Sequence, residues 1–136
     1  MRDEPDPKSE SPLCKSKSYD APSVFTPDSL LQQARRQKKL PEETVPEICV
    51  LDPDGDVVHY LAERGQAEPV PAWPGYHTDL YRFERGGETF GIIGCAVGAS
   101  FAVLVAEQLF AAGCELLISV TSSGQIRPRD DPRISS

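Results

Sequence analysis

Large apolar residues are densest between positions 89 and 126. Within this stretch, a run typical of a β-strand is followed by apolar residues at helical spacing and then by a second β-like run. Residues 89–93 and 115–120 are short β-rich runs bounded by Gly, Ala and Ser. Five residues between these runs recur at helical spacing and predict the buried face of a helix over 100–112: Phe101, Leu104, Val105, Gln108 and Leu109. Gly113 suits the left-handed cap that ends such a helix. The pattern predicts a strand, a helix and a second, parallel strand.

Weaker patterns precede this unit. Thr26, Pro27 and Asp28 are typical of an N-cap and a first helical turn, and a helix beginning there should end before Pro41. Its apolar stripe is narrow, so we expect it to pack on the domain without joining the core. Residues 46–51 predict a strand that ends in an Asp-Pro-Asp-Gly turn.

The middle of the chain is less decisive. Residues 57–62 fit either a short helix or a second strand, and residues 68–76, with three prolines, predict a loop. Residues 80–83 and 89–93 flank an Arg-Gly-Gly-Glu sequence that predicts a hairpin turn.

These patterns divide the chain into four parts. Residues 1–25 are rich in Pro, Ser and charge and predict a disordered arm. Residues 26–40 form the N-terminal helix, 45–126 an α/β unit, and 127–136 a polar tail that we expect to fray.

Charge and cysteine usage narrow the classes of partner. The chain carries 21 acidic and 14 basic residues, a net charge of −7, which argues against nucleic acid as a partner. Its four cysteines form no CxxC pair, and the three in apolar runs (Cys49, Cys95 and Cys114) are predicted to be buried free thiols. The chain opens without a signal peptide, so we expect a cytoplasmic protein. His59 and His77 lack ligand spacing to a cysteine, which predicts no metal site.

A membrane helix is the main alternative for the apolar run at 90–106, because Gly94 and Gly98 have the spacing of a helix-packing motif. The run is about 17 residues long, at the lower limit for a span, and Glu88 and Glu107 border it. A buried strand–helix–strand unit fits better, and we expect no membrane partner.

Small residues follow both strands of this unit. In open α/β sheets, ligands bind beyond the carboxyl ends of such strands. We therefore expect adjacent parallel strands whose tips, 96–100 and 121–124, open onto one hollow. The spacing of Gly94 and Gly98 does not match a dinucleotide fingerprint, and a P-loop lysine is missing. The same glycines also fit close helix–strand packing without a ligand.

The residues that follow each strand carry a family resemblance. Gly98-Ala99-Ser100, Ala106-Glu107-Gln108-Leu109 and the 119–126 loop align without gaps over 92–126 with nucleoside phosphorylases of the purine and uridine type. Residues 48–53 resemble the first strand of that family and its Gly-Asp-Pro turn. The chain thus resembles the amino-terminal half of the family's domain, which implies a three-layer αβα phosphorylase/hydrolase-like sheet, apparently truncated.

The resemblance implies cleavage of the N-glycosidic bond of a purine or pyrimidine nucleoside, with phosphate as the co-substrate and no further cofactor. By position, Ser122 and Gly98 match residues that hold phosphate and ribose, and Ser123 and Gly124 match the loop beside the base. Catalytic residues are not assigned. Relatives of this kind commonly assemble, so the implied partners are a nucleoside or ribosyl molecule and further copies of the chain.

Departures from the family pattern affect the phosphate site. Ser119 stands where the family has a phosphate-binding arginine, Leu51 where its first loop has glycine, and Gly55 or Asp56 where a second arginine is expected. Bidentate guanidinium contacts are strong, so their loss weakens phosphate binding. Phosphorolysis, hydrolysis by water and a non-catalytic α/β interaction module all remain open.

Overall fold

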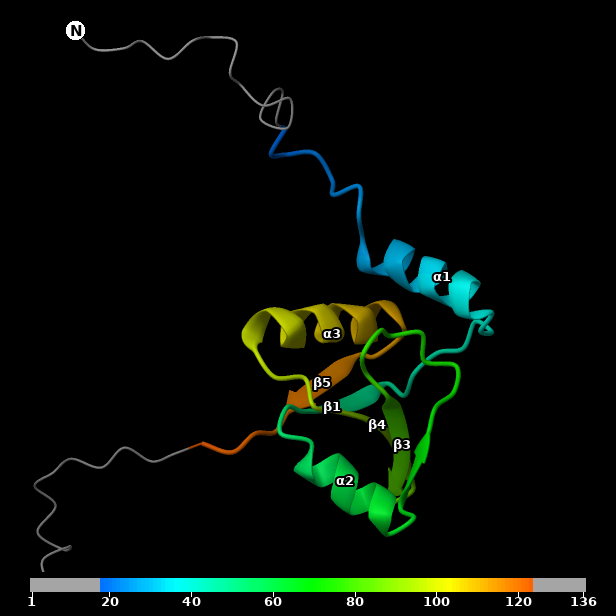
Figure 1. The fold of residues 1–136 in the computed structure, drawn as a ribbon, viewed down its shortest axis with the longest axis vertical. Helices are drawn as coiled ribbons and strands as arrows, with labels where there is room; N and C mark the ends of the chain where they lie inside the picture. The colour runs from blue at the N-terminus through cyan, green and yellow to red at the C-terminus, as the bar shows by residue number, and fades with distance from the viewer. Residues whose placement is uncertain (1–17, 124–136) are drawn as a thin grey trace, which may run out of the picture.

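A mixed, open sheet of five strands organises the protein in the computed structural model, which describes residues 18–123 (Figure 1). The sheet order is β2–β3–β4–β1–β5. Strands β4, β1 and β5 are parallel to one another, β3 pairs antiparallel with β4, and β2 pairs antiparallel with β3. The strands are β1 (Ile48–Asp52), β2 (Ala67–Pro69), β3 (Leu80–Arg85), β4 (Glu88–Gly94) and β5 (Leu116–Ser119). The general α/β class predicted from the sequence is confirmed.

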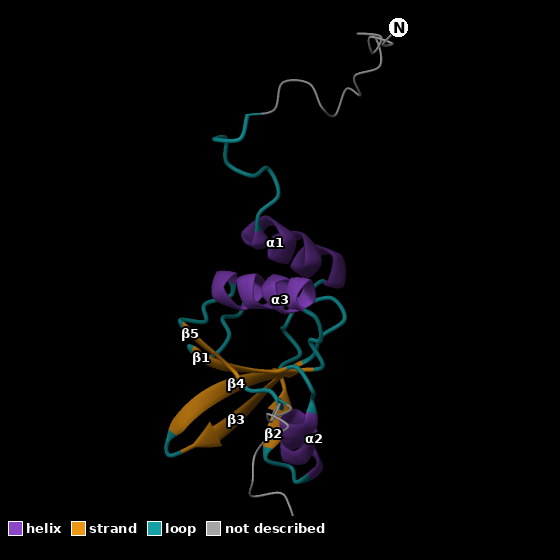
Figure 2. Cartoon of the chain, turned by 90° about the vertical axis from the view of Figure 1, so that its left-hand side faces the viewer, coloured by secondary structure: helices purple, strands orange, loops and turns teal. Residues whose placement is uncertain are grey.

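Helices lie on both sides of this sheet. They are α1 (Pro27–Lys38), α2 (Asp56–Glu63) and α3 (Ala99–Ala111). Figure 2 shows α1 and α3 on one side and α2 on the other. The helix α3 contacts α1 and β1, whereas α2 contacts β4, β2 and β1. The main core therefore lies between the sheet and the α1–α3 pair, and it includes Leu51, Leu80, Ile93, Val105 and Leu109.

The strands of the predicted strand–helix–strand unit are parallel, but they are not neighbours. Strand β1 lies between them, because Leu51 pairs with Ile93 of β4 on one side and with Ser119 of β5 on the other. The expectation of adjacent strands is thus wrong. The short apolar run of β1 takes the central place among the three parallel strands, and both of its edges are paired there.

The first helix begins and ends as predicted. The Thr26 side chain accepts the Ser29 amide, the Ser29 hydroxyl accepts the Thr26 amide, and Pro27 occupies the first turn. Lys39 then closes the helix in a left-handed conformation. One expectation is wrong, because Leu31 is buried in the main core against the α3 side. A narrow stripe suffices here, since α3 offers an apolar surface along its length.

Residues 57–62 belong to a helix, α2, which is one of the two alternatives that the sequence left open. The predicted loop at 68–76 differs in part from expectation, because it includes the end of the short strand β2. The hairpin is confirmed: Gly86 and Gly87 form a two-residue loop with φ of 61° and 85°, values that favour glycine.

The buried face of α3 was predicted only in part. Val105, Gln108 and Leu109 are buried, but the Leu104 side chain is 40% exposed. Apolar residues surround this helix almost completely, so periodicity alone does not tell which of them face the sheet. The apolar run at 90–106 divides between β4, a loop and α3, and within residues 18–123 no helix has the length and hydropathy for a bilayer crossing.

The three described cysteines fall into two environments. Cys49 and Cys114 are buried free thiols, as expected, whereas Cys95 is exposed in the loop after β4. Burial, together with the neighbouring Cys114, raises the pKa of the Cys49 thiol to about 12. Cys14 lies outside the described residues.

We expect thiol reagents to separate these environments. In a Cys14→Ser background at pH 8, Cys95 should react first. The thiolate population of Cys49 should be on the order of a thousandfold lower than that of a thiol with the ordinary pKa of 9.0. Mass spectrometry of the alkylated protein, with and without denaturant, measures the order of modification. Labelling of Cys49 as fast as Cys95 under native conditions would contradict the burial.

Candidate functional site

Three loops gather at one edge of the sheet, because the carboxyl ends of β4, β1 and β5 point the same way. They are the loops at 53–55, 95–98 and 120–123, and the first lies between the other two because β1 is the central strand. This edge is where α/β sheets place their ligands. The strand-end placement predicted from the sequence is therefore found. The third loop is the turn after β1, which the resemblance connects with the phosphate site although no site residue was predicted in it.

Asp52 connects two of these loops. Its buried carboxylate accepts the amides of Val57 and Val58 at 2.8 and 3.0 Å and so caps the start of α2. Its carbonyl oxygen accepts the amides of Gly55 and Cys95 at 3.0 and 3.1 Å. One residue thus holds the turn after β1, the first turn of α2 and the loop after β4 in a fixed arrangement.

Asp54 connects the loop at 53–55 with the loop at 120–123, which contains Ser122, a residue expected to hold phosphate and ribose. Its Oδ2 atom accepts the Ser122 amide at 3.0 Å, the Ser122 hydroxyl at 2.9 Å and the Thr121 hydroxyl at 3.3 Å. These bonds, led by the one from the Ser122 amide, lower the pKa of Asp54. The amide and hydroxyl predicted to hold phosphate are thus bound to a carboxylate of the protein. The sequence did offer a signal, an Asp-Pro-Asp-Gly turn directly after a buried strand.

The other predicted site residues lie at the same edge but are not joined to Asp54. Gly98 precedes α3 with φ of 95°, a conformation that favours glycine, and a Cβ there would meet open space. Ser123 is exposed at the end of the described chain, and Gly124 lies outside it. Within residues 18–123, no hydrogen bond links Gly98 to Ser122 or Ser123. The loop after β1 separates them.

A polar cavity of about 140 Å³ opens beside the end of β4. Its lining includes His59 of α2, Cys95, and the 77–79 segment with His77, Thr78 and Asp79. Both histidines, which the sequence treats as isolated, thus line one cavity. His77 and Cys95 both adopt left-handed conformations, with φ of 61°. In the part of the chain that the structure describes, no three His, Cys, Asp or Glu side chains are arranged to hold a metal ion.

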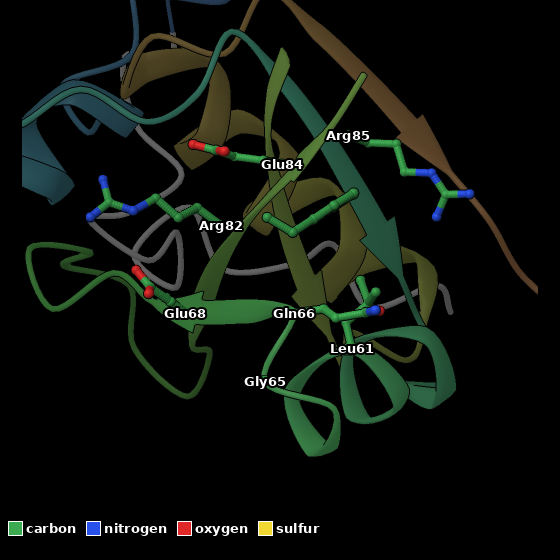
Figure 3. Close-up of a pocket in the computed structure, with 8 residues that line it drawn as sticks. Leu61, Gly65, Gln66, Glu68, Arg82, Glu84 and Arg85 are labelled. Carbon is green, nitrogen blue, oxygen red and sulfur yellow. The ribbon is translucent and has the colours of Figure 1, made fainter. Parts of the chain in front are cut away.

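A larger cavity, about 510 Å³, lies elsewhere, against β2, β3 and the end of α2 (Figure 3). Glu68 and Arg82, which are opposite each other in the antiparallel register, point to one side, and Arg85 extends away from them (Figure 3). No residue of the three strand-end loops lines this groove. The lining of this groove mixes Glu68 and Glu84 with Arg82 and Arg85, so its charges are of both signs.

Comparisons with known proteins give no independent assignment. A scan against protein-family models finds no match to this chain, and a search of curated proteins finds none either. The strand-end loops and their contacts are therefore the basis on which a function can be assigned.

Proposed function

We propose that this chain is a nucleoside phosphorylase-like α/β domain that binds a nucleoside or a related ribosyl molecule at the carboxyl edge of β4, β1 and β5. The observation that carries the proposal is the Asp54 carboxylate, which fixes the Thr121–Ser122 loop at this edge. The gapless resemblance over 92–126 supports the family. Helices on both sides of the sheet fit its three-layer αβα arrangement.

The Asp54 carboxylate suits the hydroxyl groups of a ribose. All three of its hydrogen bonds go to Oδ2, and within residues 18–123 no donor reaches Oδ1. Because Asp54 is exposed, Oδ1 can accept hydrogen bonds from a sugar diol. Hydrogen bonds to an ionised acceptor are the stronger kind, so this contact would orient the sugar.

The same carboxylate opposes phosphate. An anion beside Ser122 would meet the negative charge of Asp54 at short range, and it would have to displace that carboxylate from the loop. Ser119, where the family has arginine, supplies no compensating charge. We infer that the domain binds its ligand without phosphate as a partner, and that phosphorolysis by this chain is inefficient.

The proposal includes a cytoplasmic location. Its support is that Cys49 and Cys114 lie close enough to interact, yet both remain free thiols. Such pairs persist in a reducing compartment.

Calorimetric titration of the full chain with purine and pyrimidine nucleosides tests the proposal. We expect saturable binding that added phosphate does not strengthen, and weaker binding by Ser122→Ala, which removes one of the bonds to Asp54. Thr89→Ala, an exposed change at the opposite end of β4, is the matched control. Absence of binding to every nucleoside, or equal affinity of Ser122→Ala and the native chain, would overturn it.

A non-catalytic interaction module is the second candidate function. Its specific support is the exposed apolar surface of β5 and the residue after it, where Leu116, Ile118 and Val120 are exposed to solvent. The calorimetric titration distinguishes the two candidate functions. A pure interaction module would bind no nucleoside while retaining its affinity for a protein partner.

A further inference from the structure

The two edges of the sheet are built differently. At the β2 edge, the strand has three residues, two of them Glu68 and Pro69, and α2 packs beside it. Charge, proline and short length are the usual protections of an edge strand. At the other edge, β5 and the residue after it read Leu-Leu-Ile-Ser-Val, without a charge or a proline. The β5 edge lacks these protections.

The β5 edge is also apolar on one face. Leu116, Ile118 and Val120 alternate along the strand and are 51%, 45% and 47% exposed. They lie on the face opposite α3, since the intervening Leu117 packs against the main core. The apolar row continues into the sheet, because Leu116 pairs with Ile48, which pairs with Phe90 in turn. These side chains form a continuous apolar surface that ends at an edge with which no other strand of residues 18–123 pairs.

Backbone groups at this edge have a definite alternation. The Leu116 amide donates to the carbonyl oxygen of Glu47, just before β1, and the Val120 amide donates to that of Leu51, within β1. In a parallel ladder, consecutive residues direct their backbone groups to opposite sides. Leu117 and Ser119 therefore direct their N–H and C=O groups outward.

We propose that a second copy of this chain pairs with the β5 edge, antiparallel and centred on Ile118, to form one continuous ten-stranded sheet. This register places Leu117 opposite Ser119 of the second copy, so the outward backbone groups of both residues are satisfied. Ile118 faces its own symmetry mate as a non-hydrogen-bonded pair, the kind in which side chains approach most closely. Leu116 faces Val120 of the second copy.

A second copy fits the edge better than the remainder of this chain. Residues 1–17 contain only three apolar side chains, and residues 124–136 contain only two isoleucines. Neither segment offers the alternating apolar strand that the surface matches. Pairing of β5 with itself is isologous, so it closes at two copies. One short strand pair buries less than the roughly 1,200 Å² of a standard interface, so we expect a Kd in about the micromolar range.

Sedimentation equilibrium of the full chain, from about 1 to 200 µM, tests the proposal. We expect the native chain to reach a dimer plateau. Ile118→Lys should remain monomeric throughout this range, because the register brings two like charges directly together. Val103→Lys, at an exposed apolar position of α3, is the matched control and should still dimerise. A monomeric native chain at the highest concentration, or a dimeric Ile118→Lys, would overturn the proposal.

Two further measurements keep the result unambiguous. If Ile118→Lys does not fold, Ile118→Thr is the second variant, because threonine keeps the β-branched shape. Its dimer should have a Kd at least about tenfold higher than that of the native chain. Amide exchange of Leu117 and Ser119 should slow as concentration rises, and unchanged exchange, or growth beyond two copies, would contradict this pairing. Ligand binding is measured separately by calorimetry, so failure of the dimer and failure of the nucleoside proposal are distinguishable.

Discussion

Leu109→Ala should lower the free energy of unfolding by about 2–5 kcal/mol, the range for emptying a well-packed leucine site. The Leu109 side chain is fully buried in the main core, where α3 faces the sheet and α1. The neighbouring core residues come from β1, β4 and α1, so a cavity there cannot be closed by shifting one side chain. Urea denaturation followed by circular dichroism measures the change.

Leu104→Ala is the matched control on the same helix. Sequence periodicity assigns Leu104 to the buried face as well, and would predict a similarly large loss. Its side chain is 40% exposed, so we expect a loss below about 1 kcal/mol. Equal losses for the two variants would mean that α3 is rotated from the orientation described here.

The features predicted well from the sequence depend on local signals. A capping box around Thr26, a Gly-Gly hairpin at 86–87 and a glycine after α3 specify their own backbone conformations. Their backbone conformations can therefore be predicted without knowledge of the rest of the fold. The same is true of the strand-end position of Ser122, which follows from the position of β5 in the sequence.

The features predicted poorly depend on distant parts of the chain. No local signal indicates that β1 lies between β4 and β5, since this arrangement arises only when the later parts of the chain fold back on both sides of β1. The exposure of Leu104 and Cys95 likewise depends on which neighbours cover them. Asp54 was missed as a site residue for the same reason, because its partners Thr121 and Ser122 are far along the chain.

Asp54→Asn should change two affinities of the strand-end loops in opposite directions, raising the affinity for phosphate and lowering the affinity for nucleoside. Asparagine retains an oxygen that can accept from the Ser122 amide, but the negative charge is lost. Inorganic phosphate should therefore bind about tenfold more tightly than to the native chain, because the like-charge repulsion is removed. Nucleoside binding should weaken, because a neutral amide is a poorer acceptor for the ribose hydroxyls than a carboxylate. Parallel calorimetric titrations with phosphate and with nucleoside measure both changes.

Glu88→Gln is the control, since this exposed acid lies at the start of β4, at the opposite end of the strand from these loops. It should leave both affinities unchanged. The pKa of Asp54 is lowered in the folded chain, so its bonds to Ser122 persist at neutral pH and are lost only as the pH falls through that depressed value. The native chain should therefore gain phosphate affinity only in acid, whereas Asp54→Asn should show no such rise. If the native chain and Asp54→Asn bind phosphate equally at pH 7, the carboxylate does not occupy the anion position, and the exclusion of phosphate from this loop is incorrect.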